Sequence, residues 1–425
     1  MSEDRALEAF ERLFGPEFGH GRAFDLNPLR AALAKLGAPQ DKLPPVVHVA
    51  GTNGKGSTIA FMRAIAEAQG LRVHAFTKPH ILHLRERFVV ASEAVDEQVL
   101  ISAADEVAAA DDQLTQFDGQ VAAAFLLFAE TPADLVLLET GMGGRDDSTN
   151  IIAHPAATII TPIALDHKDT LGPTLAEIAA HKAGILKPGA PAIIARQQPE
   201  VMAFIEAHAE EIGAPLFRCG VEWDAFAQNG RLIVQTEIRM LDLPLPALVG
   251  AHQIENAGLA CAAFLAPTGL NISDDAFAHG VAHASWPGRM QRLTRGRLVD
   301  MAKPCHVEVW IDGGHNAHAA QAMKRALAEL SRKRKAKTAL VVGLRARKDW
   351  RGFADVLNGA TDFAFAVPLQ DGAAPGELAE ALGGRAAPNL DAAMQNALDL
   401  GAERVVICGS FALVAEALAD LAALN

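Results

Sequence analysis

Short apolar runs alternate with longer amphipathic stretches along most of this chain. A short apolar run between turn residues is typical of a buried strand, whereas apolar positions three and four apart are typical of a helix. Strands that alternate with helices indicate parallel sheets covered by helices, so the expected fold class is α/β. In the first part of the chain we expect strands at 46–50, 72–76, 135–139, 158–162 and 192–195, with helices at 122–129 and 175–186.

Residues 215–245 have a different pattern. The runs 216–219, 224–227 and 232–236 have the character of hairpin strands, and Asn229-Gly230 is typical of a tight turn. We therefore expect a small antiparallel edge on the main sheet.

The segment WPGR at 286–289 is a natural break, because a Pro-Gly pair interrupts regular structure. Beyond it a second α/β pattern begins, with strands expected at 307–311, 338–342, 363–367 and 405–407. The boundary is expected near residues 287–297, which gives an N-terminal domain at 1–290 and a smaller C-terminal domain at 291–425.

Composition narrows the class of protein. Half of the 425 residues are hydrophobic and 21% are charged, which fits a soluble globular enzyme with more than one domain. The formal net charge of −13 argues against broad binding of nucleic acid or anionic membranes, and the basic run at 332–337 is interpreted as the solvated end of a helix. Since we find neither a secretory signal nor a membrane-spanning run, we expect a cytoplasmic protein. The four widely spaced cysteines are interpreted as reduced thiols, not as a disulfide framework or zinc site.

The most informative segment is GTNGKGS at 51–57, which lies between an expected strand and an expected helix. A glycine-rich loop at this place turns backbone N–H groups toward phosphate oxygens. Lys55 would reach the outer phosphates, and a hydroxyl from Ser57 or Thr58 could approach Mg²⁺. The segment therefore predicts a site for a nucleoside triphosphate.

Two further segments follow apolar strands. Glu139 stands at the expected carboxyl end of a strand, where open α/β sheets bind ligands, and next to a phosphate loop it is a good Mg²⁺ ligand. His167 and Lys182 lie further along, in ALDH and HKAGI. On local evidence alone, a structural histidine and a solvated lysine are the commoner interpretations.

Six motifs occur in one order: GTNGKGS, ETGMGGRDDSTN (139–150), ALDH with HKAGI (164–185), GAHQIEN (250–256), WPGR and DGGHN (312–316). This order resembles the folylpolyglutamate synthases, whose bacterial bifunctional members are also dihydrofolate synthases. The resemblance covers about residues 25–415 and implies membership of the Mur ligase superfamily. It implies a P-loop ATPase domain followed by a Rossmann-like glutamate-ligase domain.

The resemblance also implies roles for individual residues. ATP would contact Gly51, Thr52, Asn53, Gly54, Lys55, Gly56, Ser57, Thr58, Asn256, Arg289, Asp312 and His315. Two Mg²⁺ ions would be held by Ser57, Glu139, His167 and a carbamylated Lys182, so the implied catalytic residues are Lys55, Glu139, His167 and Lys182. Pteroate would contact Thr115, Phe117 and Asp147, although plain core packing is the simplest alternative for Phe117.

The implied reaction joins L-glutamate to dihydropteroate and to reduced folates, with ATP and an acyl-phosphate intermediate. The resemblance leaves room for a monovalent cation as a further cofactor. The expected partners are these small molecules, without nucleic acid or membrane, and the expected state is a monomer.

One departure from the family pattern is Lys78, in Lys78-Pro79-His80, where the family usually has a serine that helps to hold Mg²⁺. A lysine offers three donors and no acceptor. Its ammonium could turn outward or could occupy the place of the first metal ion, and we expect the outward orientation.

Three alternatives stay open. The chain could be a monofunctional folylpolyglutamate synthase, or a regulator that binds nucleotide and has lost catalysis, which Lys78 keeps under consideration. It could also be a Mur-type amino-acid ligase. Against that alternative, such ligases usually carry threonine where Gly56 stands, and an N-terminal uridine-nucleotide domain for which we expect no room.

Overall fold

The computed structural model describes residues 4–16, 25–111, 113–267 and 269–422. The chain divides into two compact units. Of the described residues, the larger unit contains 4–247 and 254–285, and the smaller unit contains 248–253 and 286–422. The division at residue 285 is accompanied by a short excursion at 248–253, for which the sequence analysis gave no sign.

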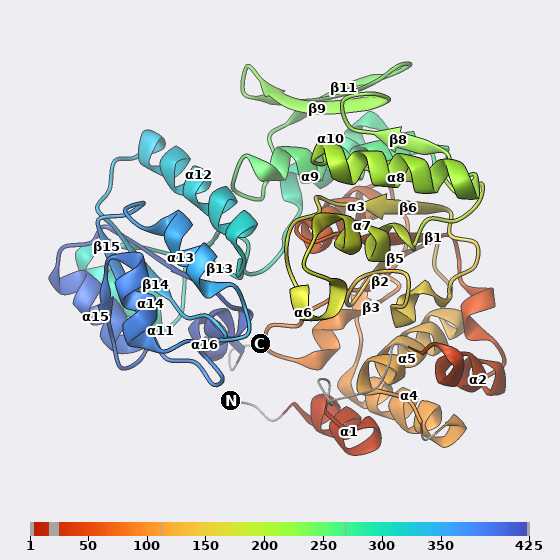
Figure 1. Cartoon of the computed structure of the whole chain (residues 1–425), viewed down its shortest axis with the longest axis horizontal. Helices are drawn as coiled ribbons and strands as arrows, with labels where there is room; N and C mark the ends of the chain where they lie inside the picture. Colours follow the sequence, from red (N-terminus) through yellow and green to blue (C-terminus); the bar gives the residue numbers. More distant parts are fainter. Residues whose placement is uncertain (1–3, 17–24, 112, 268, 423–425) are drawn as a thin grey trace. The chain divides into compact units, whose positions relative to one another are not determined.

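The larger unit is built on an eight-stranded sheet with the order β4-β3-β2-β5-β1-β6-β7-β8. The central strands β2, β5, β1, β6, β7 and β8 pair in parallel, whereas β3 and β4 form an antiparallel margin. Helices cover both sides of this parallel core (Figure 1), so β1, β2, β5, β6 and β7 are buried along their whole length and are mostly apolar, as expected from the sequence. The strands are β1 Val46–Ala50, β2 Val73–Phe76, β3 Phe88–Val90, β4 Glu93–Ala94, β5 Leu135–Glu139, β6 Ala157–Ile160, β7 Ala192–Ile194 and β8 Leu216–Arg218.

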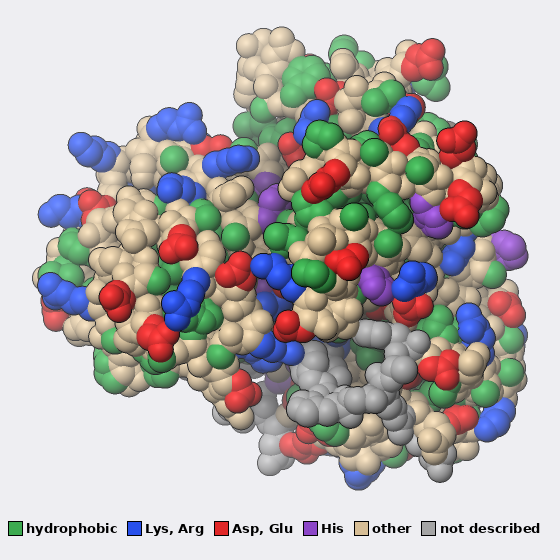
Figure 2. Space-filling view, viewed as in Figure 1, with side chains coloured by type: hydrophobic (Ala, Val, Ile, Leu, Met, Phe, Trp, Pro, Cys, Tyr) green, Lys and Arg blue, Asp and Glu red, His purple; other side chains and the backbone are tan. Residues whose placement is uncertain are grey.

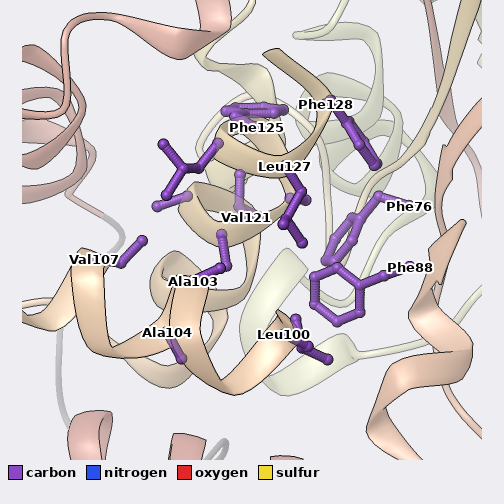
Figure 3. Packing of buried hydrophobic residues seen from close by; sticks show 14 of the residues in the cluster. Phe76, Phe88, Leu100, Ala103, Ala104, Val107, Val121, Phe125, Leu127 and Phe128 are labelled. Atoms are coloured by element: carbon purple, nitrogen blue, oxygen red, sulfur yellow. The ribbon is translucent and has the colours of Figure 1, made fainter. Parts of the chain in front are cut away.

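Two hydrophobic clusters cover one face of this sheet. Phe76 and Phe88 pack among side chains of α4 and α5 in the first cluster (Figure 3), and α7 and α8 pack over β6 and β7 in the second. Since Val46 and Ala50 belong to these two clusters, His48 between them points to the same face. The helices of the unit are α1 Arg5–Phe14, α2 Asn27–Lys35, α3 Lys55–Ala68, α4 Glu97–Ala110, α5 Gln116–Glu130, α6 Lys168–Leu171, α7 Leu175–Ala183, α8 Pro199–Ile212, α9 His252–Leu265 and α10 Asp274–His283. The first two residues of α9 belong to the smaller unit.

The region 215–245 differs from the expectation of one antiparallel edge. β8 continues the main sheet in parallel with β7, because the helix α8 provides the crossover that a parallel strand needs. A separate three-stranded antiparallel sheet follows, with β9 Trp223–Gln228, β10 Arg231–Thr236 and β11 Met240–Pro244. The turn at Asn229-Gly230 has positive φ at both residues, as the sequence predicted. Ala225 of this sheet packs so closely on α9 that a Cβ at Gly258 would lie 2.2 Å from it.

The smaller unit has a six-stranded sheet with the order β12-β13-β17-β14-β15-β16, in which only β12 is antiparallel to its neighbour. The strands expected from the sequence form its centre, whereas the short marginal strands β12 and β16 were not foreseen. The strands are β12 Gln291–Leu293, β13 Glu308–Asp312, β14 Thr338–Val342, β15 Phe363–Ala366, β16 Arg385–Ala386 and β17 Arg404–Cys408. The helices are α11 Arg297–Ala302, α12 Ala317–Lys333, α13 Trp350–Leu357, α14 Pro375–Leu382, α15 Leu390–Asp399 and α16 Phe411–Ala422.

The basic run at 332–337 begins in the exposed last turn of α12, as expected. Figure 2 shows several Lys and Arg side chains on the surface over this helix. Arg334 also has a structural role, because its guanidinium lies 3.2 Å from the carboxylate of Glu308.

The four cysteines are free thiols, of which only Cys305 is exposed. No helix in the described part of the chain is both long and apolar enough to cross a membrane.

Candidate active site

The phosphate-loop segment lies where the sequence predicted, between the end of β1 and the start of α3. Its backbone requires glycine at two positions. Gly51 has φ +143°, and a Cβ there would lie 1.9 Å from the hydroxyl of Thr161. Gly54 has φ +95°, and a Cβ there would lie 2.5 Å from Oδ1 of Asn256, which α9 contributes. Asn256 therefore lies against the loop, although it is about 200 positions away in the sequence.

Two lysines and one glutamate meet around this loop. The Lys182 ammonium is buried and donates to the carbonyl of Gly51 at 2.8 Å. The Lys55 ammonium donates to the same carbonyl at 3.2 Å and lies 3.7 Å from Oε1 of Glu139. Glu139 is itself buried, at the carboxyl end of β5. With both lysines protonated, this group of side chains carries a net charge of +1 and favours an anion.

Ser57 and Thr58 occupy the first turn of α3 and are buried. The Thr58 hydroxyl has no hydrogen-bond partner among the described residues. His167 lies on an exposed turn before α6, in a left-handed conformation with φ 52°, and its backbone N–H donates to Asp166. The metal-binding role of His167 stays a prediction.

Lys78 follows β2 and reaches two elements of the site. Its backbone N–H donates to Oε2 of Glu139 at 3.0 Å, and its ammonium lies over the Phe117 ring, 4.6 Å from the centroid. The ammonium contacts this ring because an aromatic face attracts a cation and Phe117 lies within reach. The expectation that the side chain turns away from the place of the first metal ion stays a prediction. Phe117 also packs on the turn after β5, where a Cβ at Gly141 would lie 2.4 Å from the ring.

The other two residues with a predicted pteroate contact have structural hydrogen bonds. Thr115 is the N-cap of α5 and forms a capping box with Asp118. Asp118 also accepts a hydrogen bond from the Ser148 hydroxyl at 2.6 Å, which ties α5 to the segment after β5. Asp147 accepts from the backbone N–H groups of Met142 and Thr149 and from the Thr149 hydroxyl. Burial raises the pKa of Asp147, although these hydrogen bonds act in the opposite direction.

Sequence reasoning missed His48, which extends this hydrogen-bonded chain into the sheet. The single proton of the Thr149 hydroxyl is donated to Asp147 at 2.6 Å, so Nε2 of His48, 2.8 Å away, must be the donor to Thr149. Burial, with a smaller effect of Lys187, lowers the pKa of His48 to about 3. His48 is therefore neutral at ordinary pH. A histidine inside the apolar run VVHVA was the available signal.

In the smaller unit the predicted ATP contacts surround the end of β13. Asp312 accepts hydrogen bonds from the backbone N–H groups of Met290 and Gly314, at 2.9 and 2.7 Å. The carboxylate thereby fixes the two segments that carry Arg289 and His315. Met290 has φ 40°, a conformation that this hydrogen bond helps to hold.

Phe411, which sequence reasoning also missed, links these two side chains. The Arg289 guanidinium lies over its ring, 4.8 Å from the centroid, and the His315 ring approaches edge-on with the centroids 6.4 Å apart. A Cβ at Gly313 would lie 2.7 Å from the same ring. Since GSF at 409–411 has no charged residue, the sequence gave no strong sign of this role.

The donor set around Glu139 fits Mg²⁺. Among the described residues no three His, Cys, Asp or Glu side chains form a group that could hold a metal ion. Mg²⁺, however, usually takes one or two carboxylates and completes its octahedron with water and phosphate oxygens. The buried Glu139 carboxylate beside a phosphate loop provides such an arrangement.

Two family models match the chain: "Mur ligase middle domain" at residues 49–264 and "Mur ligase, glutamate ligase domain" at 288–411. The chain is 36% identical over 356 residues to a dihydrofolate synthase/folylpolyglutamate synthase of Bacillus subtilis, covering 79% of this chain and 77% of the relative. It is 34% identical over 408 residues to the protein of that name in Escherichia coli, covering 93% and 91%.

Solved structures agree with these relatives. E. coli FolC in complex with DHPP and ADP has a TM-score of 0.87 at 32% identity, covering 98% of this chain and 97% of that chain. A bifunctional folylpolyglutamate synthase/dihydrofolate synthase with Mn, AMPPNP and L-glutamate bound has a TM-score of 0.83 at 33% identity, covering 95% of each chain.

Proposed function

Because the chain belongs to the dihydrofolate synthase/folylpolyglutamate synthase family of Mur ligases, we propose that it joins L-glutamate to dihydropteroate and to reduced folates with ATP. The observation that carries this proposal is the group formed by Lys55, Lys182 and Glu139 around the Gly51 carbonyl. It offers positive charge and a metal-binding carboxylate beside a loop that suits phosphates, with the Phe117 ring nearby.

The reaction has two steps. A carboxylate oxygen of the acceptor attacks the γ-phosphorus of ATP, ADP leaves, and an acyl phosphate forms. The amine of glutamate then attacks the acyl carbon, loses a proton and displaces phosphate, which leaves an amide. The backbone N–H groups of residues 51–57 would bind the ATP phosphates, and the Lys55 ammonium would offset the charge that builds up during phosphoryl transfer.

Two divalent cations would be held by Ser57, Glu139, His167 and Lys182 and would stabilise the charge on the transferred phosphoryl group. Lys182 can act as a metal ligand only after modification. Its neutral amine would add CO₂ and lose a proton, giving a carbamate with oxygen donors. The burial of Lys182 near the phosphate loop supports this proposal, because an ammonium there would repel a cation.

In the smaller unit, Arg289, Asp312 and His315 would contact ATP, with Arg289 and His315 held by Phe411. In the larger unit, pteroate would contact Thr115, Phe117 and Asp147. The family resemblance implies small-molecule substrates alone, so we further propose that the chain works as a monomer in the cytoplasm. We also propose that a monovalent cation assists the reaction.

The test is release of phosphate by the purified chain with ATP, Mg²⁺, L-glutamate and either dihydropteroate or tetrahydrofolate. We expect turnover with both acceptors. Turnover with tetrahydrofolate alone would leave a monofunctional synthase. Turnover with a uridine-linked muramyl acceptor, or ATP binding without any turnover, would overturn the proposal. Repeating the assay with K⁺ replaced by a bulky organic cation tests the monovalent ion.

A further inference from the structure

Lys78 contacts both the Glu139 carboxylate beside the phosphate loop and the Phe117 ring. Its backbone N–H is bonded to Glu139, which in turn contacts the Lys55 ammonium. Its ammonium lies over Phe117, the ring that packs on the turn after Glu139. The one residue therefore spans from the carboxylate beside the phosphate loop to the aromatic ring.

The segment that carries Lys78 is fixed in place by a buried arginine. Arg87 donates through Nε to Nδ1 of His80 at 3.0 Å, and through its Nη1 to the side-chain oxygen of Gln120 at 2.6 Å. Gln120 is fully buried in α5, the helix that also carries Phe117. Because an arginine only donates, His80 presents a bare Nδ1 to it. These bonds hold the Lys78 segment against α5 before any ligand binds.

An acceptor for this enzyme must bring an aromatic portion and a carboxylate into the same site. The carboxylate must reach the phosphate loop to be phosphorylated, while the aryl and pterin groups need an apolar, aromatic contact. The Lys78 ammonium lies on the ring, and the backbone of the same residue is bonded to the carboxylate beside the phosphate loop, so the cation is within one side-chain length of the place that the acceptor carboxylate must reach. A lysine serves this purpose as a compact charge with three donors, and the ring face holds it without removing its charge.

We propose that the Lys78 ammonium binds the acceptor carboxylate that is to be phosphorylated, and that Lys78 is a specificity-determining residue for anionic acceptors. The inference rests on the proposed function. It replaces the alternative in which the ammonium stands in for a metal ion at the phosphates.

The direct test is equilibrium binding of dihydropteroate and of its methyl ester, without ATP or metal, to the parent and to Lys78→Met. The parent should bind the carboxylate more tightly than the ester. Loss of one charge-assisted hydrogen bond should weaken carboxylate binding by about tenfold to a hundredfold in Lys78→Met and leave ester binding within about twofold. The carboxylate affinity of the parent should also fall with added salt, and that of the variant should fall less steeply.

Steady-state kinetics give a second readout. Lys78→Met should raise the KM for dihydropteroate, with the KM for ATP and the Mg²⁺ requirement within about twofold, and Lys78→Arg should restore part of the loss. Lys35→Met is the matched control, because Lys35 is an exposed lysine of α2 in the same unit. The backbone bond to Glu139 survives substitution, so thermal unfolding should show that each variant is folded.

If Lys78→Met binds dihydropteroate and its methyl ester more weakly than the parent by the same factor, Lys78 only positions Phe117 and the inference is overturned. A changed Mg²⁺ requirement with unchanged acceptor affinity would show instead that the ammonium replaces a metal ion. If the parent neither binds nor turns over dihydropteroate or tetrahydrofolate, the proposed function itself fails. A parent that is active on these acceptors, with Lys78→Met indistinguishable from it, refutes only the role of Lys78.

Discussion

Single buried polar side chains connect the parts of the larger unit. Lys182 of α7 donates to the carbonyl of Gly51, and His48 of β1 donates to Thr149 in the segment after β5. Each contact replaces a hydrogen bond to water with one inside the protein, so each is needed to avoid an unpaired buried group. Substitutions at these positions separate catalytic from structural roles.

Lys182→Ala should lower kcat by roughly 10²–10³-fold, because the proposed carbamate near the divalent cations is lost. Its stability should fall by only about 1 kcal/mol, the usual contribution of one hydrogen bond. Added short-chain carboxylates should restore part of the turnover by replacing the carbamate. Near-normal turnover in this variant would show that Lys182 is structural only.

His48 should make the protein sensitive to acid. Its pKa is lowered to about 3 in the folded chain from 6.5, so the unfolded chain binds the extra proton in the window between these values. The stability contribution is complete above pH 6.5 and is lost as the pH falls, at about 1.4 kcal/mol for each pH unit.

The measurement compares urea unfolding of the parent and His48→Gln between pH 7 and pH 4.5. Glutamine keeps a donor near Nε2 and does not titrate. The difference in unfolding free energy between the two proteins should therefore shift in favour of the variant as the pH falls. Parallel pH profiles would contradict a neutral, buried His48.

At the scale of elements, turns and helix ends hold the aromatic rings of the site. The turn after β5 is in contact with Phe117 of α5, and the start of α16 supplies Phe411 between Arg289 and His315. In each case a glycine gives the ring room, since a Cβ at Gly141 or Gly313 would overlap it. Changes at these contacts should affect one substrate and not the others.

Gly141→Ala should displace the Phe117 ring, because the new methyl group would lie 2.4 Å from it. We expect the KM for dihydropteroate to rise about tenfold or more, with a smaller change in the KM for ATP. Gly376→Ala is the control, since a Cβ there has nothing within 4 Å. An unchanged KM for dihydropteroate in Gly141→Ala would mean that Phe117 does not contact the acceptor.

Phe411→Leu should raise the KM for ATP by about threefold to tenfold, because a cation–π contact of about 1 kcal/mol with Arg289 is lost along with the ring contact to His315. Phe411→Tyr keeps the ring and should behave as the parent does. The KM for dihydropteroate should stay within about twofold in both. A rise in that KM equal to the rise for ATP would indicate general damage to the fold.

At the scale of the whole molecule, features that depend on neighbouring residues could be predicted from the sequence, whereas contacts between distant residues could not. The central strands and the phosphate loop were predictable because periodicity and the strand-glycine-helix order are local signals. The bond between His48 and Thr149 joins positions 101 apart, and the apolar run around His48 signals the histidine but not its partner. The contact between Lys78 and Phe117 was not predicted for the same reason, since it depends on a ring that a distant helix supplies.

Because residues 248–253 belong to the smaller unit, that unit is discontinuous in the sequence. Val249 packs in the hydrophobic cluster of the smaller unit, whereas residues 254–285 return to the larger one. A fragment that begins at residue 286 would therefore lack one of its own hydrophobic contacts, and its counterpart would carry Val249 without the side chains that Val249 packs against. Truncation at this boundary should therefore give two fragments that fold poorly. If the two halves are co-expressed, the N-terminal fragment can supply Val249 to the C-terminal one.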